Sequence, residues 1–358
     1  MTTAFTLHRL AEHTKRRVRS VITTTAGMMG IGVLYAFVFR GGDPHIILNG
    51  IAIGLIVGTV SSVGEMYWFQ SHARRWRFWV LLAVRSTFYI ALISVAVVFT
   101  VMVHLALEES HGVKESLSSR QFLDFLANGE FTRVVLYAVI GTLAVNFTRQ
   151  VNVLIGQNAL LYFITSKYHT PLEEERIFMF LDLTSSTHIA ETLGHTVYHR
   201  FLNDFFHDIT PAILESRGEI YQYVGDEVVV TWPGKTGLRD GNCLGCFLAA
   251  RAAIELSRER YEREYGTVPS FKAGYHIGLV TVAEIGEVRK QIVFHGDTVN
   301  TAARIRSECT SVGKDLLLSD TLVKRLDTGD LFTYDSVGQI RLSGKAAPME
   351  LFTVREAG

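Results

Sequence analysis

Two aspartates lie at the ends of apolar, β-rich runs in this chain of 358 residues. Asp182 follows the run 178–181 and precedes the hydroxyl-rich turn 184–187. Asp226 lies in a Gly-Asp turn within the β-rich stretch 220–232. Carboxylates that adjacent strands bring together form a site for two hard divalent cations. Two such cations support phosphoryl-type chemistry on a nucleoside triphosphate.

Each aspartate alone also has a purely structural explanation. Asp182 could cap a helix, because an acidic residue is common before the first helical turn, and Asp226 could be an ordinary hairpin residue. A helix that begins in the hydroxyl-rich turn would direct backbone N–H groups at phosphate oxygens. The residues expected to bind phosphate in this way are Thr184, Ser185, Ser186 and Thr187.

Three further polar residues could act on the same kind of substrate. Asn300 and Arg304 are four residues apart, so a helix would place both side chains on one face. The amide could then orient a ribose, and the guanidinium could stabilise charge at an α-phosphate. Lys345, ahead of a final strand, could bind the terminal phosphates as a point charge. The alternatives are a solvated helix face and an exposed loop lysine.

The residues from 172 to 358 suit one domain that positions these side chains. Strands are expected at 176–183, 219–232 (a hairpin), 271–282, 290–295, 315–319, 337–343 and 350–355. Helices are expected at 186–216, 241–264, 298–310 and 320–326. This mixture predicts an α+β sheet with helices on one face. Cys243 and Cys246 form a lone CxxC, which is a weak zinc signal without a second ligand pair, so buried helix cysteines are favoured.

The first 155 residues hold the apolar excess behind a mean hydropathy of +0.22. Four stretches there approach or exceed the roughly 20 apolar residues that cross a bilayer. These spans are expected near 20–39, 46–69, 78–106 and 132–154. They predict an all-α four-helix transmembrane domain over 1–146. The formal net charge is zero, which argues against nucleic acid as a partner, because phosphate neutralisation drives such binding.

Basic residues indicate how the spans are oriented. They concentrate before the first span and in the second connection, whereas the first and third connections are not basic. The positive-inside rule then places both termini and the last domain in the cytoplasm. A multi-pass protein of the plasma membrane is expected, with lipid as a partner. Glu65 and Arg85 either form an intramembrane ion pair or extend separately to the interface.

Residues 147–171 form the expected helical connector. Its positions 147, 151, 154, 158, 161 and 165 alternate by four and three, as in a short heptad seam. The seam contains Asn158 and Thr165, and polar seam residues set register at some cost in stability. A parallel helix pair would couple the two domains as a transducer, and the alternative is a helix packed on its own domain.

Four motifs resemble those of class III nucleotidyl cyclases, in the same order along the chain. They are Leu181–Thr187, Val224–Glu227, Gly296–Arg304 and Gly344-Lys345. The resemblance implies a ferredoxin-like α+β catalytic domain. It further implies that Asp182, Leu183 (by its carbonyl) and Asp226 hold two Mg²⁺ or Mn²⁺ ions. In this family one domain supplies the aspartates and another supplies Asn and Arg, so a homodimer with two equivalent sites is expected.

The residues at the expected base-reading positions match neither usual pair of the family. Gln222 stands where adenylate-specific members usually carry Lys, and Val293 where they carry Asp or Thr. Guanylate-specific members tend to carry Glu and a small residue such as Cys there. Gln222 can donate and accept a hydrogen bond, and the absence of Glu removes the strongest feature for guanine. ATP is therefore the favoured substrate.

The resulting expectation is a membrane-anchored adenylate cyclase that converts ATP to 3′,5′-cyclic AMP and pyrophosphate, regulated through its membrane domain by a ligand that the sequence does not reveal. A guanylate cyclase on the same scaffold is the first alternative. A diguanylate cyclase would not explain Asn300 and Arg304. A catalytically silent membrane receptor with a nucleotide-binding module is the alternative that is not an enzyme.

Overall fold

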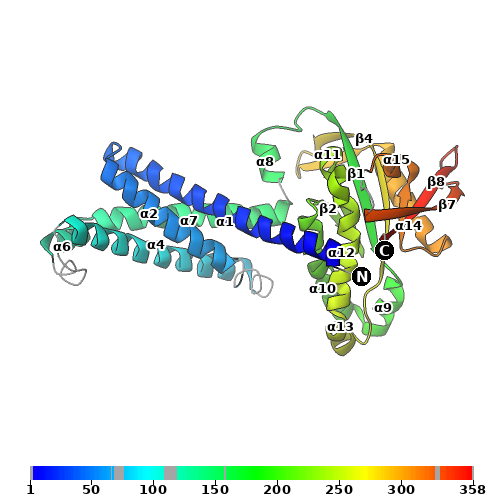
Figure 1. Ribbon diagram of the computed structural model, residues 1–358, viewed down its shortest axis with the longest axis horizontal. Coiled ribbons are helices and arrows are strands. Elements are labelled where there is room, and N and C mark those ends of the chain that lie inside the picture. Colours follow the sequence, from blue (N-terminus) through cyan, green and yellow to red (C-terminus); the bar gives the residue numbers. More distant parts are fainter. Residues whose placement is uncertain are drawn as a thin grey trace. The chain divides into compact units, whose positions relative to one another are not determined.

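The computed structural model describes residues 3–65, 67, 76–108, 119–156, 159–326 and 331–356. The chain folds into two compact units, Met1–Leu154 and Ile155–Gly358. The first unit is helical and the second is built on a mixed sheet (Figure 1). This arrangement confirms the expected combination of a helical N-terminal bundle and an α+β domain.

The first unit consists of long apolar helices. Its helices are α1 (Thr3–Arg40), α2 (Pro44–Gly64), α4 (Phe78–Glu108), α6 (Arg120–Ala127) and α7 (Glu130–Ile155). Four segments are long and apolar enough to cross a membrane: Val21–Phe39, Pro44–Gly64, Phe78–Ala106 and Glu130–Asn152. Within the described residues, the four expected apolar helices of membrane-spanning length are therefore confirmed. The expected end of the second span, at 69, lies outside the described residues.

Helices α1 and α2 contact each other through glycine. A Cβ atom built at Gly50 would lie 2.6 Å from the carbonyl oxygen of Gly32, so the two backbones touch directly. Small residues permit such close approach between membrane helices. Of the glycines in the first span, Gly27 and Gly30 have open space around them and take no part in this contact.

A partly buried ion pair lies within the helical unit. Arg85 Nη2 donates to Glu65 Oε2 at 3.2 Å, and the Tyr89 hydroxyl donates to Glu65 Oε1 at 2.6 Å. The side chains of Arg85 and Glu65 are only 12% and 22% exposed. The expected pairing is confirmed, and separate extension to the interface is not observed. Pairing and the tyrosine hydrogen bond offset the burial of both charges.

The second unit is a sheet of eight strands in the order β2-β3-β1-β4-β6-β8-β7, with β5 added to β4. The strands are β1 (Leu172–Leu183), β2 (Glu219–Val224), β3 (Glu227–Pro233), β4 (Phe271–Ile285), β5 (Gln291–His295), β6 (Leu316–Ser319), β7 (Phe332–Ile340) and β8 (Met349–Glu356). The helices of eight residues or more are α9 (Ser186–Leu193), α10 (His195–Glu215), α12 (Asn242–Leu256), α13 (Arg258–Tyr265) and α14 (Asp297–Ser311). Shorter helical segments are α8 (Ala159–Ile164), α11 (Gly234–Leu238), α15 (Asp320–Val323) and the 3₁₀ turn Arg239–Gly241. The expected long helix 186–216 is broken at Gly194, which has φ +73°.

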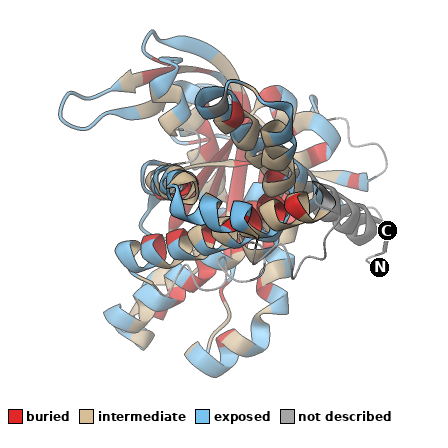
Figure 2. Cartoon of the chain, turned by 90° about the vertical axis from the view of Figure 1, so that its left-hand side faces the viewer, coloured by how far each residue is buried: buried red, intermediate tan, exposed pale blue. Residues whose placement is uncertain are grey.

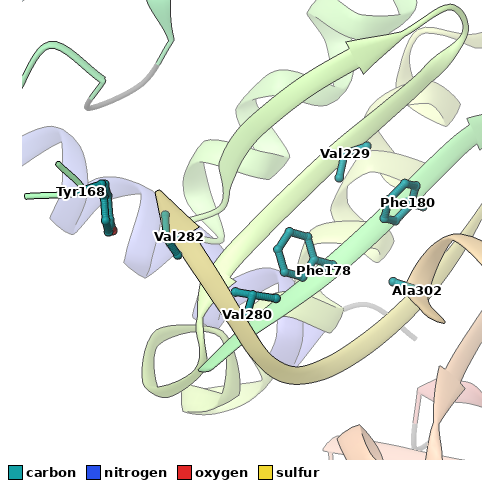
Figure 3. Packing of buried hydrophobic residues seen from close by; sticks show 7 residues of the cluster. All are labelled: Tyr168, Phe178, Phe180, Val229, Val280, Val282 and Ala302. Atoms are coloured by element: carbon teal, nitrogen blue, oxygen red, sulfur yellow. The ribbon is translucent and has the colours of Figure 1, made fainter. Parts of the chain in front are cut away.

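Helices cover both faces of the sheet, so the prediction of helices on one face was wrong. Phe178 and Phe180 on β1 pack with Val280 and with Ala302 of α14 on one face (Figure 3). Phe271 faces the opposite way and contacts Phe205 of α10 and Phe247 of α12. The central strands are buried along most of their length (Figure 2). Strands that are apolar on both faces require cover on both.

The expected connector 147–171 is not one continuous helix. Helix α7 ends at Ile155, Gly156 has φ +105°, and α8 spans only Ala159–Ile164. A left-handed residue interrupts the right-handed helix. The seam residue Asn158 lies outside the described residues. The parallel pairing of two connectors stays a prediction.

Candidate active site

Strand pairing places the two predicted metal-binding aspartates at one edge of the sheet. Asp182 near the end of β1 lies opposite Glu227, the first residue of β3. Asp226 immediately precedes Glu227 in the turn from β2, where Gly225 has φ +63° and permits the tight reversal. The adjacent strands therefore gather three acidic side chains, as the two motifs predicted for the aspartates.

An arginine that the sequence did not single out completes this edge. Arg306 Nη1 donates to Asp182 Oδ2 at 3.0 Å, and Nη2 lies 2.7 Å from Glu227 Oε2. Burial raises the pKa of Asp182 and of Glu227, and the Arg306 guanidinium opposes this effect at both. The Asp226 carboxylate contributes to the raised pKa of Asp182. When ionised, Asp182 and Glu227 together carry two negative charges, and the single positive charge of Arg306 offsets only one of them.

This carboxylate edge fits a hard divalent cation. The raised pKa of Asp182 marks a carboxylate that an added positive charge would stabilise in its ionised form. Among the described residues there is no group of three or more His, Cys, Asp or Glu side chains arranged to hold a metal ion. Mg²⁺ usually takes only one or two carboxylates and completes its shell with water and substrate phosphates. The Leu183 carbonyl follows Asp182 directly and stays a predicted ligand.

The hydroxyl-rich turn does begin a helix. Helix α9 starts at Ser186 after Ser185, which has φ +57°, and the first N–H groups of a helix have no partner within it. The N–H of Thr184 differs, because it donates to the carbonyl of Ser270 at 2.8 Å. The Thr184 N–H is therefore not available to phosphate in this structure. Phosphate binding by backbone N–H groups stays a prediction for Ser185, Ser186 and Thr187.

A second polar group surrounds the start of α14. Asn300 is exposed and Arg304 half-buried on this helix. Arg304 Nη2 approaches the backbone at Gly344, where an added Cβ would lie 3.2 Å away. The Lys345 ammonium forms an ion pair with the Asp297 carboxylate. Arg304 and Lys345 therefore lie close together beside α14, and Asn300 lies about one turn before Arg304 on the same helix.

The two groups lie on different flanks of the same helix. Arg306 reaches the carboxylate edge, whereas Arg304, two residues earlier, faces Gly344. Two residues turn an α-helix by about 200°. Arg304 and Arg306 are close in sequence, yet their side chains project from different sides of α14. The position of Arg306 beside the buried residues Ala302, Ile305 and Cys309 was the available signal for contact with the sheet.

The expected base-reading positions lie on neighbouring strands. Gln222 on β2 is exposed and Val293 on β5 is half-buried. The adjacent residues Tyr221 and Phe294 are in contact, with ring centroids 4.9 Å apart. Side chains alternate along β5, so Val293 projects away from that contact. Strand β2 is irregular between Ile220 and Gln222, and Gln222 pairs with Val229, which lies on the same face of the sheet as that contact. Nothing about their geometry selects adenine over guanine.

The CxxC cysteines are part of the helical core. Cys243 and Cys246 are fully buried in α12. Burial raises the pKa of Cys243 to about 12, which disfavours the thiolate that zinc requires. These features agree with the expectation of buried helix cysteines.

Acid is expected to destabilise the second unit through His276. Its Nδ1 lies 2.8 Å from Ser319 Oγ, and burial, assisted by Lys345, lowers the pKa of His276 to about 4. The unfolded chain takes up a proton near pH 6.5, so this stability is complete above pH 6.5 and is lost as pH falls towards 4. The loss by pH 4.5 is roughly 2 kcal/mol.

Thermal unfolding of the wild type and a His276→Gln chain at pH 7 and pH 4.5 tests this expectation. The glutamine keeps a polar partner for Ser319 but takes up no proton in this range. The wild type should lose more thermal stability between the two pH values than the variant does. Equal losses would show that His276 does not control the acid response.

Comparisons with known proteins identify the family of the second unit. Residues 170–356 match the family described as the adenylate and guanylate cyclase catalytic domain. Adenylate cyclase 2 of Rhizobium meliloti (strain 1021) is 32% identical over 221 residues, which are 62% of this chain and 61% of that protein. An adenylate cyclase of Anabaena cylindrica is 26% identical over 187 residues, which are 49% of this chain and 36% of that protein. The chain thus spans less than two thirds of either relative.

One solved structure shows the same fold. A bacterial light-regulated adenylyl cyclase has a TM-score of 0.50 and 20% sequence identity. The similarity covers 61% of this chain and 64% of that chain. At this identity the comparison concerns the path of the backbone, not the substrate.

Proposed function

The chain belongs to the family of class III adenylate and guanylate cyclases, and from this premise we propose that it is a membrane-anchored adenylate cyclase. Its reaction converts ATP into 3′,5′-cyclic AMP and pyrophosphate. The proposal is supported by the proximity of Asp182 and Asp226 at the ends of adjacent strands, and by the proximity of Arg304 and Lys345 beside α14, which also carries Asn300. A silent binding module would not need both groups.

The side chains suit an attack of the ribose 3′-oxygen on the α-phosphate, with pyrophosphate as the leaving group. Asp182, Asp226 and the Leu183 carbonyl would hold two Mg²⁺ or Mn²⁺ ions, which lower the pKa of the 3′-hydroxyl and offset charge on pyrophosphate. Asn300 orients the ribose, and Arg304 stabilises the charge that develops at the α-phosphate. Lys345 exchanges its ion pair with Asp297 for the terminal phosphates.

The active enzyme in this proposal is a homodimer with two equivalent sites. Within one chain, Arg306 of α14 contacts the carboxylate edge while Arg304 faces Gly344 on another flank. A single nucleotide therefore cannot bridge Asp182 and Arg304 by a simple side-chain rotation in one chain. A symmetric pair of chains supplies the missing half to each site.

ATP is the proposed substrate, and a guanylate cyclase is the second candidate. The similar proteins named adenylate cyclase support ATP, and Gln222 lacks the carboxylate that would pair with guanine N1 and N2. The purified full-length protein should form cyclic AMP from ATP with Mn²⁺ or Mg²⁺. Cyclic GMP as the main product from GTP would replace this proposal with the second candidate.

A Gln222→Glu chain is expected to shift selectivity towards GTP. The new carboxylate can accept from guanine N1 and N2 but meets no donor on adenine N1, so the ratio of kcat/KM for GTP to that for ATP should rise at least about tenfold. Both nucleotides are assayed with Mn²⁺. Gln339→Glu adds the same charge on exposed β7 and should leave the ratio unchanged. An unchanged ratio in both variants would remove Gln222 from base recognition.

The helical unit is proposed to lie in the plasma membrane with both termini and the cyclase domain in the cytoplasm. The supporting observation is the concentration of basic residues before the first span and in the second connection. Tags at both termini should resist protease in intact cells and be cleaved after permeabilisation. Cleavage of either tag in intact cells would contradict the orientation.

Regulation of the cyclase by the membrane domain through residues 147–171 is also proposed. The four spans exceed what a simple anchor requires. Deletion of residues 1–140 should change the rate or the metal dependence of cyclic AMP formation. If both stayed as in the full-length protein, the membrane domain would be an anchor alone.

A further inference from the structure

The helical unit contains a partly open cavity of about 460 Å³. Helices α1, α2, α4 and α7 supply most of its lining, and Phe125 of α6 also lines it. Most lining side chains are aliphatic or aromatic, among them Ile53, Val57 and Val97. Its volume lies within the range of small-molecule sites, roughly 300–1,000 Å³.

One polar side chain in the lining has an unused acceptor. Asn146 is 1% exposed, and its Nδ2 donates to Ser86 Oγ at 3.4 Å. Its Oδ1 has no hydrogen-bond partner among the described residues. An unsatisfied carbonyl is costly where neither water nor another donor reaches it. No described residue donates to the Asn146 oxygen in this structure, so the oxygen can accept a hydrogen bond from a bound molecule.

The charge of the lining indicates whether a ligand that donates to Asn146 Oδ1 is charged or neutral. Glu130 is the one carboxylate among the described lining residues, and none of these lining residues is Lys, Arg or His. An anionic ligand such as a fatty acid would find no counter-charge there and would meet the carboxylate. A neutral hydroxyl satisfies Asn146 without introducing a charge.

We propose that this cavity binds a neutral amphipathic molecule, an aliphatic body that carries a hydroxyl group. The aliphatic part occupies the apolar lining, and the hydroxyl donates to Asn146 Oδ1. Binding at this site is independent of the proposed cyclase activity, because it involves only the helical unit. It supplies a defined site for the unknown membrane ligand.

Photolabelling of the full-length protein in lipid nanodiscs, without nucleotide, tests the proposal. The probe is a long-chain primary alcohol with a diazirine in the chain, and adducts are located by mass spectrometry. Adducts are expected on lining residues of α2, α4 and α7. Excess 1-dodecanol should compete strongly, whereas sodium dodecanoate should compete at least about tenfold more weakly because no counter-charge is present. Equal competition by dodecanoate would overturn the assignment of a neutral ligand.

Two glycines provide a matched pair of variants. Gly141 lines the cavity and Gly30 does not, yet a Cβ added at either meets no atom within 4 Å. Gly141→Leu should reduce labelling at least about tenfold by filling the cavity, whereas Gly30→Leu should leave it unchanged. Equal labelling in both variants would show that the probe reports general contact with lipid and would overturn the site.

Asn146→Leu tests the hydrogen bond itself. Competition by 1-dodecanol should weaken roughly fivefold, and competition by n-dodecane should stay as in the wild type. An unchanged preference for the alcohol would remove Asn146 from the site. Should this variant fail to insert or fold, the glycine pair still decides whether the cavity binds the probe.

Discussion

An Asp226→Asn chain is expected to form cyclic AMP at about one thousandth of the wild-type rate or less, because a cation clamp contributes several kcal/mol to transition-state stabilisation. Asparagine keeps the size of the turn residue but removes the charge beside Asp182 at the sheet edge. The measurement is product formation from ATP with saturating Mn²⁺, followed by chromatography.

The control for this variant is Asp315→Asn, which removes an exposed carboxylate just before β6. It should keep the wild-type rate. Binding of Mn²⁺ without nucleotide, followed by electron paramagnetic resonance, should weaken in Asp226→Asn alone. Activity within tenfold of the wild type would contradict the assignment of Asp226 as a metal ligand.

Two inactive chains are expected to restore activity when they pair. Asp226→Asn disables the carboxylate half of a site and Arg304→Ala disables the half around α14, so each homodimer should be nearly inactive. A heterodimer has one intact site and one site with both defects, so it should show about half the wild-type rate per dimer. Two different affinity tags and sequential purification isolate the heterodimer.

The control is a doubly substituted chain, Asp226→Asn with Arg304→Ala, paired with Asp226→Asn. This heterodimer contains no intact site and should stay inactive. A purified Asp226→Asn/Arg304→Ala heterodimer without activity, despite stable pairing, would contradict a site shared between chains. An Arg304→Ala homodimer with full activity would remove that residue from the reaction.

The apolar helices, two central strands and one turn could be predicted, because their formation depends on residues that are close together in the sequence. Hydropathy over about 20 residues is enough to identify a membrane span, and all four spans were found. Continuous apolar, β-rich runs predicted β1 and β3, and the turn at Gly225-Asp226 followed from its residue types. The edge that holds Asp182 could therefore be predicted, because it needs only the correct ends of two strands.

Features that depend on distant parts of the chain could not be predicted in the same way. The cover on both faces follows from the burial of Phe178 on one side of β1 and Met179 on the other, and this pattern shows strand burial without naming the covering helix. The contact of Arg306 with Asp182 joins residues 124 positions apart. The break at Gly156 was missed because the heptad spacing continued through it.

Arg306 also bears on how a newly made chain reaches its finished form. Its guanidinium neutralises part of the charge of Asp182 and Glu227 as soon as α14 packs on the sheet. Packing of α14 against the strand ends that carry Asp182 and Glu227 therefore does not require a bound metal ion. Small domains whose folding depends on their metal differ in this respect. In the proposed enzyme, a divalent ion bound later would take over this neutralisation from the Arg306 guanidinium. The cell's supply of divalent ions would then govern how many folded molecules are active, and not how many of them fold.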